Sequence, residues 1–214
     1  PISMLHHTPL PLSLIGYSGH AYVVIDVFTS QGQTVAAYCE PQPKTHNPYA
    51  LHYLGAETNP QTLLLLQNYR YFIAIGSNAV REKLHAFLFS ALQAVPENAL
   101  HKTAYIAPGV QLGSGIMVGA KAVVNPLCSI GNGVICNTGS VVEHECMIAD
   151  FVHIAPNATL CGGVRVGRGS FVGAGAVVKE GITIGNYATI GAGAVVLKNV
   201  PHGATVVGNP QRFL

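Results

Sequence analysis

Charged side chains are scarce in this sequence. Asp, Glu, Lys and Arg together make up 9% of its 214 residues, against about a quarter in an ordinary soluble protein. A chain with so little charge either spans a membrane or covers much of its surface with other subunits. No apolar run approaches the roughly 18 to 20 residues that a bilayer requires, since the longest candidate is residues 63–66. An oligomer is therefore expected.

The chain also lacks the features of several functional classes. Its net charge is only +2, which gives little electrostatic support for a nucleic-acid partner. It contains no CxxC pair, so we expect its cysteines to be small hydrophobic residues and not metal or redox groups. The first residues show no signal-peptide pattern, and a reducing cytoplasm is the expected compartment. The five cysteines are Cys39, Cys128, Cys136, Cys146 and Cys161.

A six-residue repeat fills the carboxyl-terminal half. Every sixth residue from Ile106 to Val196 is Leu, Ile or Val, with one Cys, and the residue four places further on is small or apolar. Gly often follows the aliphatic position. The aliphatic column is Ile106, Leu112, Val118, Val124, Ile130, Cys136, Val142, Ile148, Ile154, Leu160, Val166, Val172, Val178, Ile184, Ile190 and Val196.

This period predicts a parallel β-helix. Residues two apart on a strand face the same way, so Ser140 and Val142, one from each column, both point inward. Three short sides turned at Gly or Asn corners close a triangular coil, and about five coils of 18 residues fit between 106 and 200. An ordinary β-sandwich would need a turn every 8 to 12 residues or so and would not keep a strict six-residue phase.

Several outward positions of the repeat are apolar. They include Val141, Met147, Val177 and Val195. Packing prisms side by side buries such faces, and threefold closure is the natural solution. We predict a homotrimer.

Residues 1–100 have a different pattern, and residues 101–214 form the predicted β-helix domain. Strands at 12–15, 34–38 and 71–75 alternate with helices, which indicates a small parallel sheet. The segment 41–60, rich in Pro and His, reads as loop. A helix covers residues 22–28, and a second begins at a cap on Ser77 or Asn78, with an apolar stripe of Val80, Leu84, Phe87, Leu88 and Ala91.

In parallel α/β sheets ligands bind beyond the carboxyl ends of the strands. The turns at 16–19 and 76–78 both lie there, and Gly allows backbone N–H groups to approach phosphates. The turn sequence Gly-x-x-Gly-His-Ala is not the dinucleotide fingerprint. A tight strand-to-helix turn explains it equally well.

His144 is the candidate general base. It lies between Glu143 and Glu145, on a corner flanked by the inward Val142 and Cys146, so it projects outward. A carboxylate beside a histidine fixes its tautomer and stabilises the imidazolium that forms. The alternative is an ordinary solvated corner histidine.

His153 also faces out of the coil, between Val152 and Ile154. It is nine residues from His144, half a coil away, so the two side chains of one subunit diverge. The hypothesis is that each active site combines His144 of one subunit with His153 of a neighbour. Cationic side chains that could meet the phosphates of CoA are Arg165, Arg168, Lys179, Lys198 and Arg212.

Four segments carry a family resemblance that covers nearly all of residues 12–214. The chain resembles the sialic acid O-acetyltransferase and nucleotide-amino-sugar N-acetyltransferase family of hexapeptide-repeat sugar acyltransferases. The resemblance implies an α/β Rossmann-like amino-terminal domain followed by a left-handed parallel β-helix. The segments are 16–20 (Gly-Tyr-Ser-Gly-His), 73–78 with Arg81, 137–146 (Asn-Thr-Gly-Ser-Val-Val-Glu-His-Glu-Cys) and 207–210. Residues 1–11, with His6 and His7, match nothing in the family.

The resemblance implies an acetyl-CoA-dependent enzyme without a metal. His144 would be the general base, its basicity raised by Glu145. The acceptor would be the 4-amino group of a nucleotide-linked amino-deoxy sugar. Substrate contacts would fall on Ser18, Gly19, His20, Glu40, Gly76 and Asn137, and acetyl-CoA contacts on His153, Gly162 and Ala174. Relatives often have an acidic pair where this chain has Cys39-Glu40, and Gln211 replaces their usual Ala.

Three other functions remain open on the sequence. O-acetylation of a sialic-acid-type sugar uses the same fold. A zinc carbonic-anhydrase-like trimer would need three converging histidines, whereas residues 106–200 contain only His144 and His153. A non-catalytic sugar-binding scaffold would leave the pair His144-Glu145 unexplained.

Overall fold

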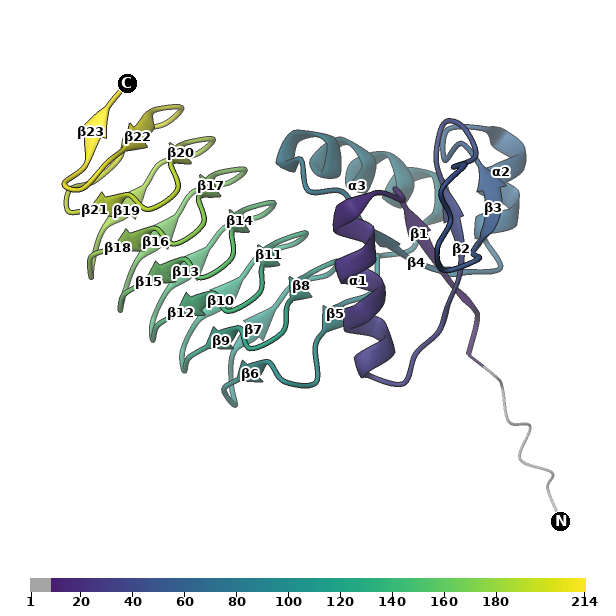
Figure 1. Cartoon of the computed structure of the whole chain (residues 1–214), viewed down its shortest axis with the longest axis horizontal. Coiled ribbons are helices and arrows are strands. Elements are labelled where there is room, and N and C mark those ends of the chain that lie inside the picture. The colour runs from purple at the N-terminus through teal and green to yellow at the C-terminus, as the bar shows by residue number, and fades with distance from the viewer. Residues whose placement is uncertain (1–8) are drawn as a thin grey trace, which may run out of the picture.

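The computed structural model of the chain describes residues 9–214; residues 1–8, which include His6 and His7, lie outside them. The β-helix and an α/β region lie at opposite ends of an elongated molecule, with the carboxyl terminus at the far end of the β-helix (Figure 1). Within the described part of the chain, no helix is long and apolar enough to cross a membrane.

The α/β region is built on four parallel strands in the order β3-β2-β1-β4. This is the arrangement of half a doubly wound nucleotide-binding sheet. The three expected strands are confirmed. The strands are β1 (Leu12–Ile15), β2 (Val35–Cys39), β3 (His52–Gly55) and β4 (Arg70–Ile73).

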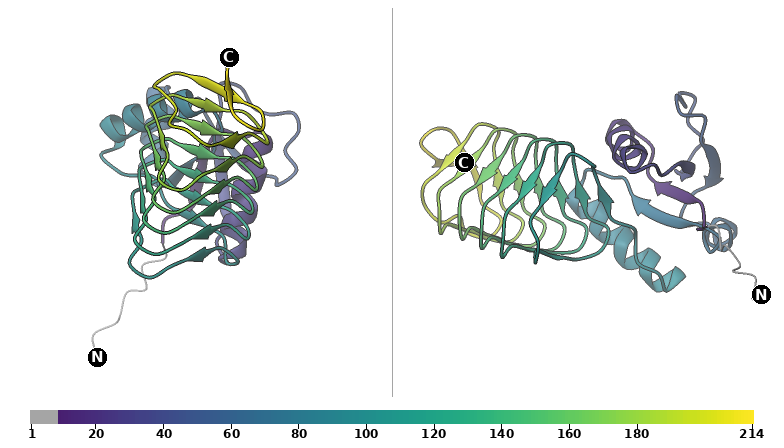
Figure 2. Two further views of the ribbon diagram at one scale, coloured as in Figure 1. Left: turned by 90° about the vertical axis from the view of Figure 1, so that its left-hand side faces the viewer. Right: turned by 90° about the horizontal axis from the view of Figure 1, so that it is seen from below.

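Helices cover both faces of this sheet. The expected first helix is α1 (Gly19–Ser30), whose buried Val24 and Phe28 pack on Leu14 and Phe72. The other face carries α2 (Pro60–Leu66) and α3 (Asn78–Leu92). The cluster beneath α1 also includes Met117 and Ile135 of the β-helix, so α1 is held between the sheet and the first coils (Figures 1 and 2).

The expectation that residues 41–60 are loop is wrong in part. β3 lies within that segment and pairs with β2, and the Tyr38 and Tyr53 rings stack with centroids 5.3 Å apart. β3 is an edge strand of four residues with an exposed His52, so it has no clear alternation to reveal it. The helix α2 was not expected either; Asn59 caps it, and Pro60 occupies its first turn.

The expected apolar stripe on α3 is wrong in part. Only Leu88 of that stripe is fully buried, while Val80, Phe87 and Ala91 are exposed. The reason is that the first turn of α3 packs against the β-helix through a buried charged residue, Arg81. Ser77 is the N-cap residue, as expected, although its side chain makes no capping hydrogen bond within the described residues.

The β-helix begins at β5 (Ala99–Leu100), one strand before the repeat becomes regular at Ile106. Its strands fall into three sheets. One contains β6 (Tyr105–Ile106), β9 (Val123–Val124), β12 (Val141–Val142), β15 (Thr159–Leu160), β18 (Val177–Val178) and β21 (Val195–Val196). The second contains β7 (Gln111–Leu112), β10 (Ser129–Ile130), β13 (Met147–Ile148), β16 (Arg165–Val166) and β19 (Thr183–Ile184).

The third sheet faces the α/β region. It contains β5, β8 (Met117–Val118), β11 (Ile135–Cys136), β14 (His153–Ile154), β17 (Phe171–Val172), β20 (Thr189–Ile190) and β22 (Thr205–Val207). The final strand, β23 (Arg212–Phe213), pairs antiparallel with β22. Every other pairing in the three sheets is parallel.

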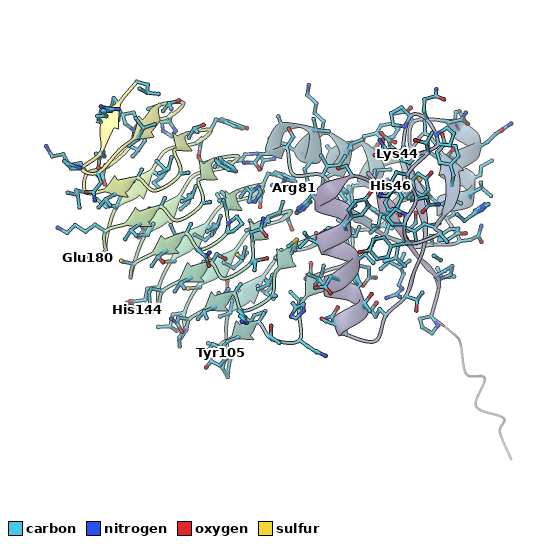
Figure 3. The ribbon with its side chains drawn as sticks, viewed as in Figure 1. Lys44, His46, Arg81, Tyr105, His144 and Glu180 are labelled. Carbon is cyan, nitrogen blue, oxygen red and sulfur yellow. The ribbon has the colours of Figure 1, made fainter. Side chains whose placement is uncertain are left out.

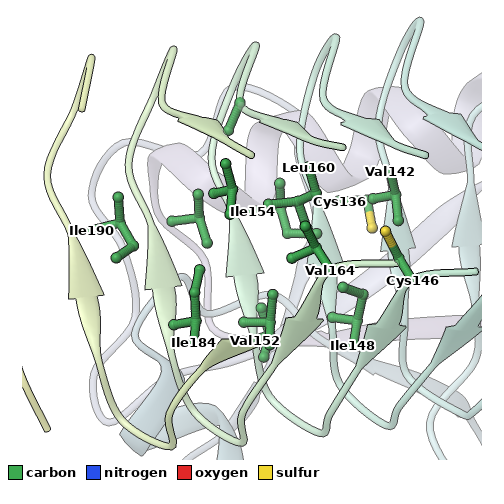
Figure 4. Packing of buried hydrophobic residues seen from close by; sticks show 14 of the residues in the cluster. Cys136, Val142, Cys146, Ile148, Val152, Ile154, Leu160, Val164, Ile184 and Ile190 are labelled. Atoms are coloured by element: carbon green, nitrogen blue, oxygen red, sulfur yellow. The ribbon is translucent and has the colours of Figure 1, made fainter. Parts of the chain in front are cut away.

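The interior of the β-helix is filled by the two columns that the sequence predicts. Residues 18 apart pair in register, as Val142 does with Leu160, so aliphatic side chains stack along the axis (Figure 4). Cys128, Cys136 and Cys146 are buried in this core, and all five cysteines, which lie within residues 9–214, are free thiols.

Candidate active site

In parallel α/β sheets ligands bind beyond the carboxyl ends of the strands where the strand order reverses. Here that region lies at the ends of β1 and β4, and we call it the crevice. Gly16 follows β1 with φ +94°, and a Cβ there would lie 2.6 Å from Ile75 Cγ1, so only glycine fits the turn. Ser18 is the N-cap of α1 and is exposed together with Gly19. The first N–H groups of α1 therefore open into the crevice and favour an anion.

Glu40, just after β2, borders the same crevice. Its Oε1 accepts a hydrogen bond from the backbone N–H of Tyr17 at 2.7 Å, and its Oε2 lies 3.3 Å from Lys44 Nζ. The Tyr17 hydroxyl donates to Asn47 Oδ1 at 2.8 Å. The loop after β2 is thereby tied to the turn after β1.

Two histidines from distant parts of the sequence meet where the crevice reaches the β-helix. The rings of His20, on α1, and His153, on β14, have centroids 6.3 Å apart. His153 faces out of the coil as expected, but it is only 9% exposed because the α/β region covers it. Asn137, a predicted substrate residue, is 3.2 Å from His153 Nε2 through its amide nitrogen.

The hydrogen bonds assign the tautomer of His153. Asn137 Oδ1 accepts from the backbone N–H of Thr138 at 2.8 Å, so its amide nitrogen is the donor toward His153 Nε2. A neutral His153 then carries its proton on Nδ1. That nitrogen is buried and has no hydrogen-bond partner within residues 9–214. The backbone of Gly76 acts on this ring and raises its pKa slightly, against the larger effect of burial.

Both histidines are held neutral. Burial lowers the pKa of His153 to about 4, with further contributions from the positive charge of Arg81 and from His20. Burial, followed by Arg81, likewise lowers the pKa of His20 to about 4. Desolvation and a nearby cation both disfavour the imidazolium. At neutral pH these rings act as hydrogen-bonding groups and not as charges.

Arg81 is a central residue to which the sequence assigned no role. It is 1% exposed, and its guanidinium donates to five oxygens, four of them backbone carbonyls. Burial lowers its pKa to about 10, so it stays charged. The acceptors are the carbonyls of Ile75, Gly76, Gly133 and Phe151 and the side chain of Asn78, at 2.7 to 3.1 Å. Arg81 therefore fixes the turn after β4 against two corners of the β-helix.

The predicted catalytic pair lies on a different corner of the coil. His144 is in the turn between β12 and β13, and its Nδ1 is 3.1 Å from Glu145 Oε2. The side chains are 58% and 63% exposed. Glu145 has φ +60°, a left-handed conformation that is costly for a residue with a Cβ. The equivalent position one coil further on is Gly163, at φ +67°.

One chain does not bring the two groups together. Asn137 and Ala174 lie on the corners that join the sheet of β14 to the sheet of β12, whereas His144 and Gly162 lie on the next corner along the coil. In Figure 3, His144 lies along the edge away from Arg81. The predicted site residues thus form two half-sites, one at the junction with the α/β region and one at the His144 corner.

The predicted phosphate-binding cations are not all free. Arg168 is bound by Glu82 at 2.7 Å and Asp150 at 2.8 Å, and its guanidinium lies over the Phe151 ring, so it braces α3 against the β-helix. Arg165 is exposed and lines a groove over β13, β16 and β19. No three His, Cys, Asp or Glu side chains within the described ranges gather in a way that could hold a metal ion.

Comparison with known proteins places both halves of the chain. The family model described as the PglD N-terminal domain matches residues 11–88, and that of the bacterial transferase hexapeptide matches residues 163–198. A mutant of the perosamine N-acetyltransferase from Caulobacter crescentus, solved with CoA and GDP-perosamine, is 36% identical, with 95% of this chain and 96% of that chain covered and a TM-score of 0.90.

A second solved structure agrees over the same length. The acetyltransferase domain of PglB from Neisseria gonorrhoeae, solved with acetyl coenzyme A, is 31% identical. The match covers 97% of this chain and 100% of that chain, with a TM-score of 0.88. The amino-terminal Rossmann-like domain and the left-handed β-helix expected from the sequence are confirmed. The chain belongs to the nucleotide-amino-sugar N-acetyltransferase family, whose members are acetyl-CoA-dependent hexapeptide-repeat enzymes.

Proposed function

We propose that this protein transfers the acetyl group of acetyl-CoA to the 4-amino group of a nucleotide-linked amino-deoxy sugar, with His144 as the general base. The observation that carries the proposal is the outward His144 whose Nδ1 is held by Glu145 at 3.1 Å. This contact uses Nδ1, so Nε2, which makes no hydrogen bond within the described residues, remains to accept a proton. The relative from Caulobacter crescentus, solved with GDP-perosamine and CoA, supports this class of acceptor.

The nucleotide sugar would bind in the crevice after β1 and β4. Its diphosphate would be bound by the N-terminal N–H groups of α1 at Ser18 and Gly19, where the helix dipole favours negative charge. Glu40, Gly76 and His20 would contact the nucleoside and sugar. This arrangement directs the sugar from the sheet toward Asn137 and the β-helix.

Acetyl-CoA would lie along the β-helix, near His153, Gly162 and Ala174. The Nδ1–H of His153 makes no hydrogen bond of standard geometry among residues 9–214, although the backbone of Gly76 acts on the ring. It would donate to a carbonyl oxygen of the thioester or the pantetheine arm. A histidine that stays neutral suits this task, because it donates a hydrogen bond from Nδ1 and takes no part in proton transfer. Arg165 is exposed near this surface and suits the phosphates of CoA.

The active site would be completed in a homotrimer. His144 lies one corner away from the junction that holds His20 and His153, so a second chain must supply one of the two half-sites. Half-exposed apolar side chains on the outer faces, such as Met147 (48%), Val177 (39%) and Tyr105 (54%), are suited to this packing. We also propose a cytoplasmic location, which suits five free thiols.

The reaction needs no covalent enzyme intermediate. The sugar amine attacks the carbonyl carbon of the thioester while His144 Nε2 removes one amine proton. Glu145 stabilises the imidazolium that forms. The tetrahedral intermediate collapses as the C–S bond breaks, and the thiolate leaves with the proton from His144. The products are the acetamido sugar and CoA with a free thiol.

Two variants test the proposal. His144→Ala should lower kcat by roughly 10² to 10⁴, as for a lost general base, while acetyl-CoA binding measured by calorimetry survives.

Gly19→Glu should raise the KM for the nucleotide sugar strongly, since it adds a carboxylate at the diphosphate position. The fold should tolerate it, because a Cβ at Gly19 meets nothing within 4 Å in the described structure.

Mass spectrometry of products from a panel of nucleotide-linked amino sugars would identify the acceptor. We expect a gain of one acetyl group on nitrogen. Acetylation of a sialic-acid-type hydroxyl in its place, or near-normal turnover by His144→Ala, would contradict the proposal.

A further inference from the structure

The corner that carries His144 recurs once per coil, and Gly162 is its neighbour in the next coil. Positions 126, 144, 162 and 180 form one column, occupied by Pro126, His144, Gly162 and Glu180. Gly163 N–H donates to the carbonyl of His144 at 2.9 Å, which fixes the stacking of these two corners. Figure 3 shows His144 and Glu180 along the same edge of the β-helix.

The imidazole of His144 occupies the space that a side chain at 162 would fill. A Cβ on Gly162 would lie 2.5 Å from Cε1, 2.7 Å from Nε2 and 3.2 Å from Nδ1 of His144. Other glycines of the coil that a side chain obstructs, such as Gly133 and Gly169, have φ +62° and +67°, so their backbone conformation already favours glycine. A Cβ on Gly167 or Gly173 would meet backbone atoms of the next coil at 2.5 Å, so the fold itself requires glycine there.

We infer that Gly162 is a positioning residue for His144: its missing side chain provides the surface on which the imidazole lies. The inference rests on the proposed role of His144 as general base. Gly162 lies outside the left-handed region that Gly163 adopts at φ +67°, so its backbone conformation does not demand glycine. Glycine is required at position 162 because the His144 imidazole occupies the space of a side chain there.

An alanine at 162 would displace the ring and spare the coil. The obstructing atoms belong to the end of an exposed side chain, which can rotate into solvent. The ring would then lose its 3.1 Å contact with Glu145 and move Nε2 away from the acceptor amine. A displacement of about 1 Å can cost roughly a hundredfold in rate. Alanine retains the backbone N–H, so a contact from that N–H to acetyl-CoA would persist.

A double-mutant cycle tests the inference on the full-length enzyme. We compare three variants, Gly162→Ala, His144→Ala and the double variant. For each of them kcat, the Kd for acetyl-CoA and Tm are measured. We expect Gly162→Ala to lower kcat by about 10- to 100-fold and to leave Kd within about threefold. In the His144→Ala background it should have no further effect, because residues acting through one group are not additive. Glu180→Ala, one coil further along the column, is the control and should stay within about twofold.

Other results would overturn either the inference about Gly162 or the proposed function. If Gly162→Ala has wild-type kcat while His144→Ala is impaired, the inference is wrong and the proposed function stands. Equal losses in both backgrounds, or a large rise in the Kd for acetyl-CoA, would also overturn the inference, since they indicate a role in the fold or in binding. Near-normal turnover by His144→Ala would overturn the proposed function itself.

Discussion

The pairing of His144 with Glu145 joins a chemical requirement to a conformational cost. Glu145 holds a left-handed backbone at φ +60°, and so do its equivalents Leu127 one coil earlier, at φ +64°, and Gly163 one coil later; the conformation belongs to the corner. A non-glycine residue in that conformation costs of order 1 kcal/mol or more. From this corner the carboxylate of Glu145 contacts His144 Nδ1.

Glu145→Gln separates charge from shape. The amide keeps the size and backbone of the side chain but removes the negative charge that stabilises the imidazolium. We expect kcat to fall roughly 10- to 100-fold with Tm and acetyl-CoA Kd unchanged. Unchanged kcat would show that the contact with His144 does not contribute to catalysis. Glu143→Gln, the same change on the other side of His144, is the matched control.

His153 makes stability depend on pH. Its pKa is lowered to about 4 in the folded protein, against about 6.5 when unfolded. As pH falls, His153 is therefore protonated in the unfolded chain before it is protonated in the folded protein. Its contribution to the free energy of unfolding is fully present above pH 6.5 and is lost as pH falls toward 4. Between pH 7 and pH 5 this one residue accounts for a loss of about 2 kcal/mol.

Denaturant unfolding at pH 7 and pH 5 measures this effect. His153→Gln retains a polar side chain without the titration, so its stability should fall less between the two pH values, by about 2 kcal/mol. His52→Gln is the control, because His52 is exposed on β3. An unchanged difference in the His153 variant would show that the ring is already protonated or solvated in the folded state.

The outward direction of both histidines could be predicted from sequence because strand alternation leaves no choice once the inward columns are known. The burial of His153 could not. It depends on α1 packing over β14, a contact between residues 133 positions apart in the sequence at His20 and His153. Arg81 was passed over for the same reason, because two of its acceptors, the carbonyls of Gly133 and Phe151, lie on corners far along the chain.

At the scale of elements, α3 joins the two domains through its first turn. Arg81 donates to the carbonyls of Gly133 and Phe151 in the β-helix and of Ile75 and Gly76 after β4. Asn78 adds hydrogen bonds to the carbonyls of Gly169 and Ser170, both at 3.0 Å. These contacts place the crevice beside the β-helix face that carries His153.

Arg81→Met tests this junction. Methionine fills similar volume but leaves four buried carbonyls without their donor, and each such group costs about 1 to 3 kcal/mol. We expect a loss of at least about 3 kcal/mol in the free energy of unfolding, together with faster proteolysis between the domains. Lys83→Met, an exposed change on the same helix, should stay within about 0.5 kcal/mol. Equal stability of the two variants would contradict the role of Arg81.

The elements differ in how much of them the sequence predicts. The β-helix is predictable because its six-residue period is repeated in every coil, so a single residue that departs from the pattern does not hide it. β3 and α2 are short and occur once, and their stability comes from packing with β2 and α3. The stripe on α3 failed because its first turn binds the β-helix through a charged residue, which a search for apolar periodicity overlooks.

At the scale of the molecule, the central claim is that each active site contains His144 from one subunit and the nucleotide-sugar crevice from another. The two half-sites lie on different corners of one coil, and we propose that a second chain completes each of them. The low charge of the chain and its half-exposed apolar outer faces both fit such packing.

Complementation between two inactive variants tests this claim most directly. His144→Ala removes the base from one half-site, and Gly19→Glu blocks the crevice of the other, so each variant alone should have little activity at a nucleotide-sugar concentration near the wild-type KM. When the two are co-expressed in equal amounts, a site between subunits is intact if one neighbour has His144 and the other has Gly19. Random assembly makes about a quarter of sites intact, so a site shared between subunits should give about a quarter of the wild-type rate. Activity no higher than that of the two separate variants would contradict it, because it would place both half-sites in one chain.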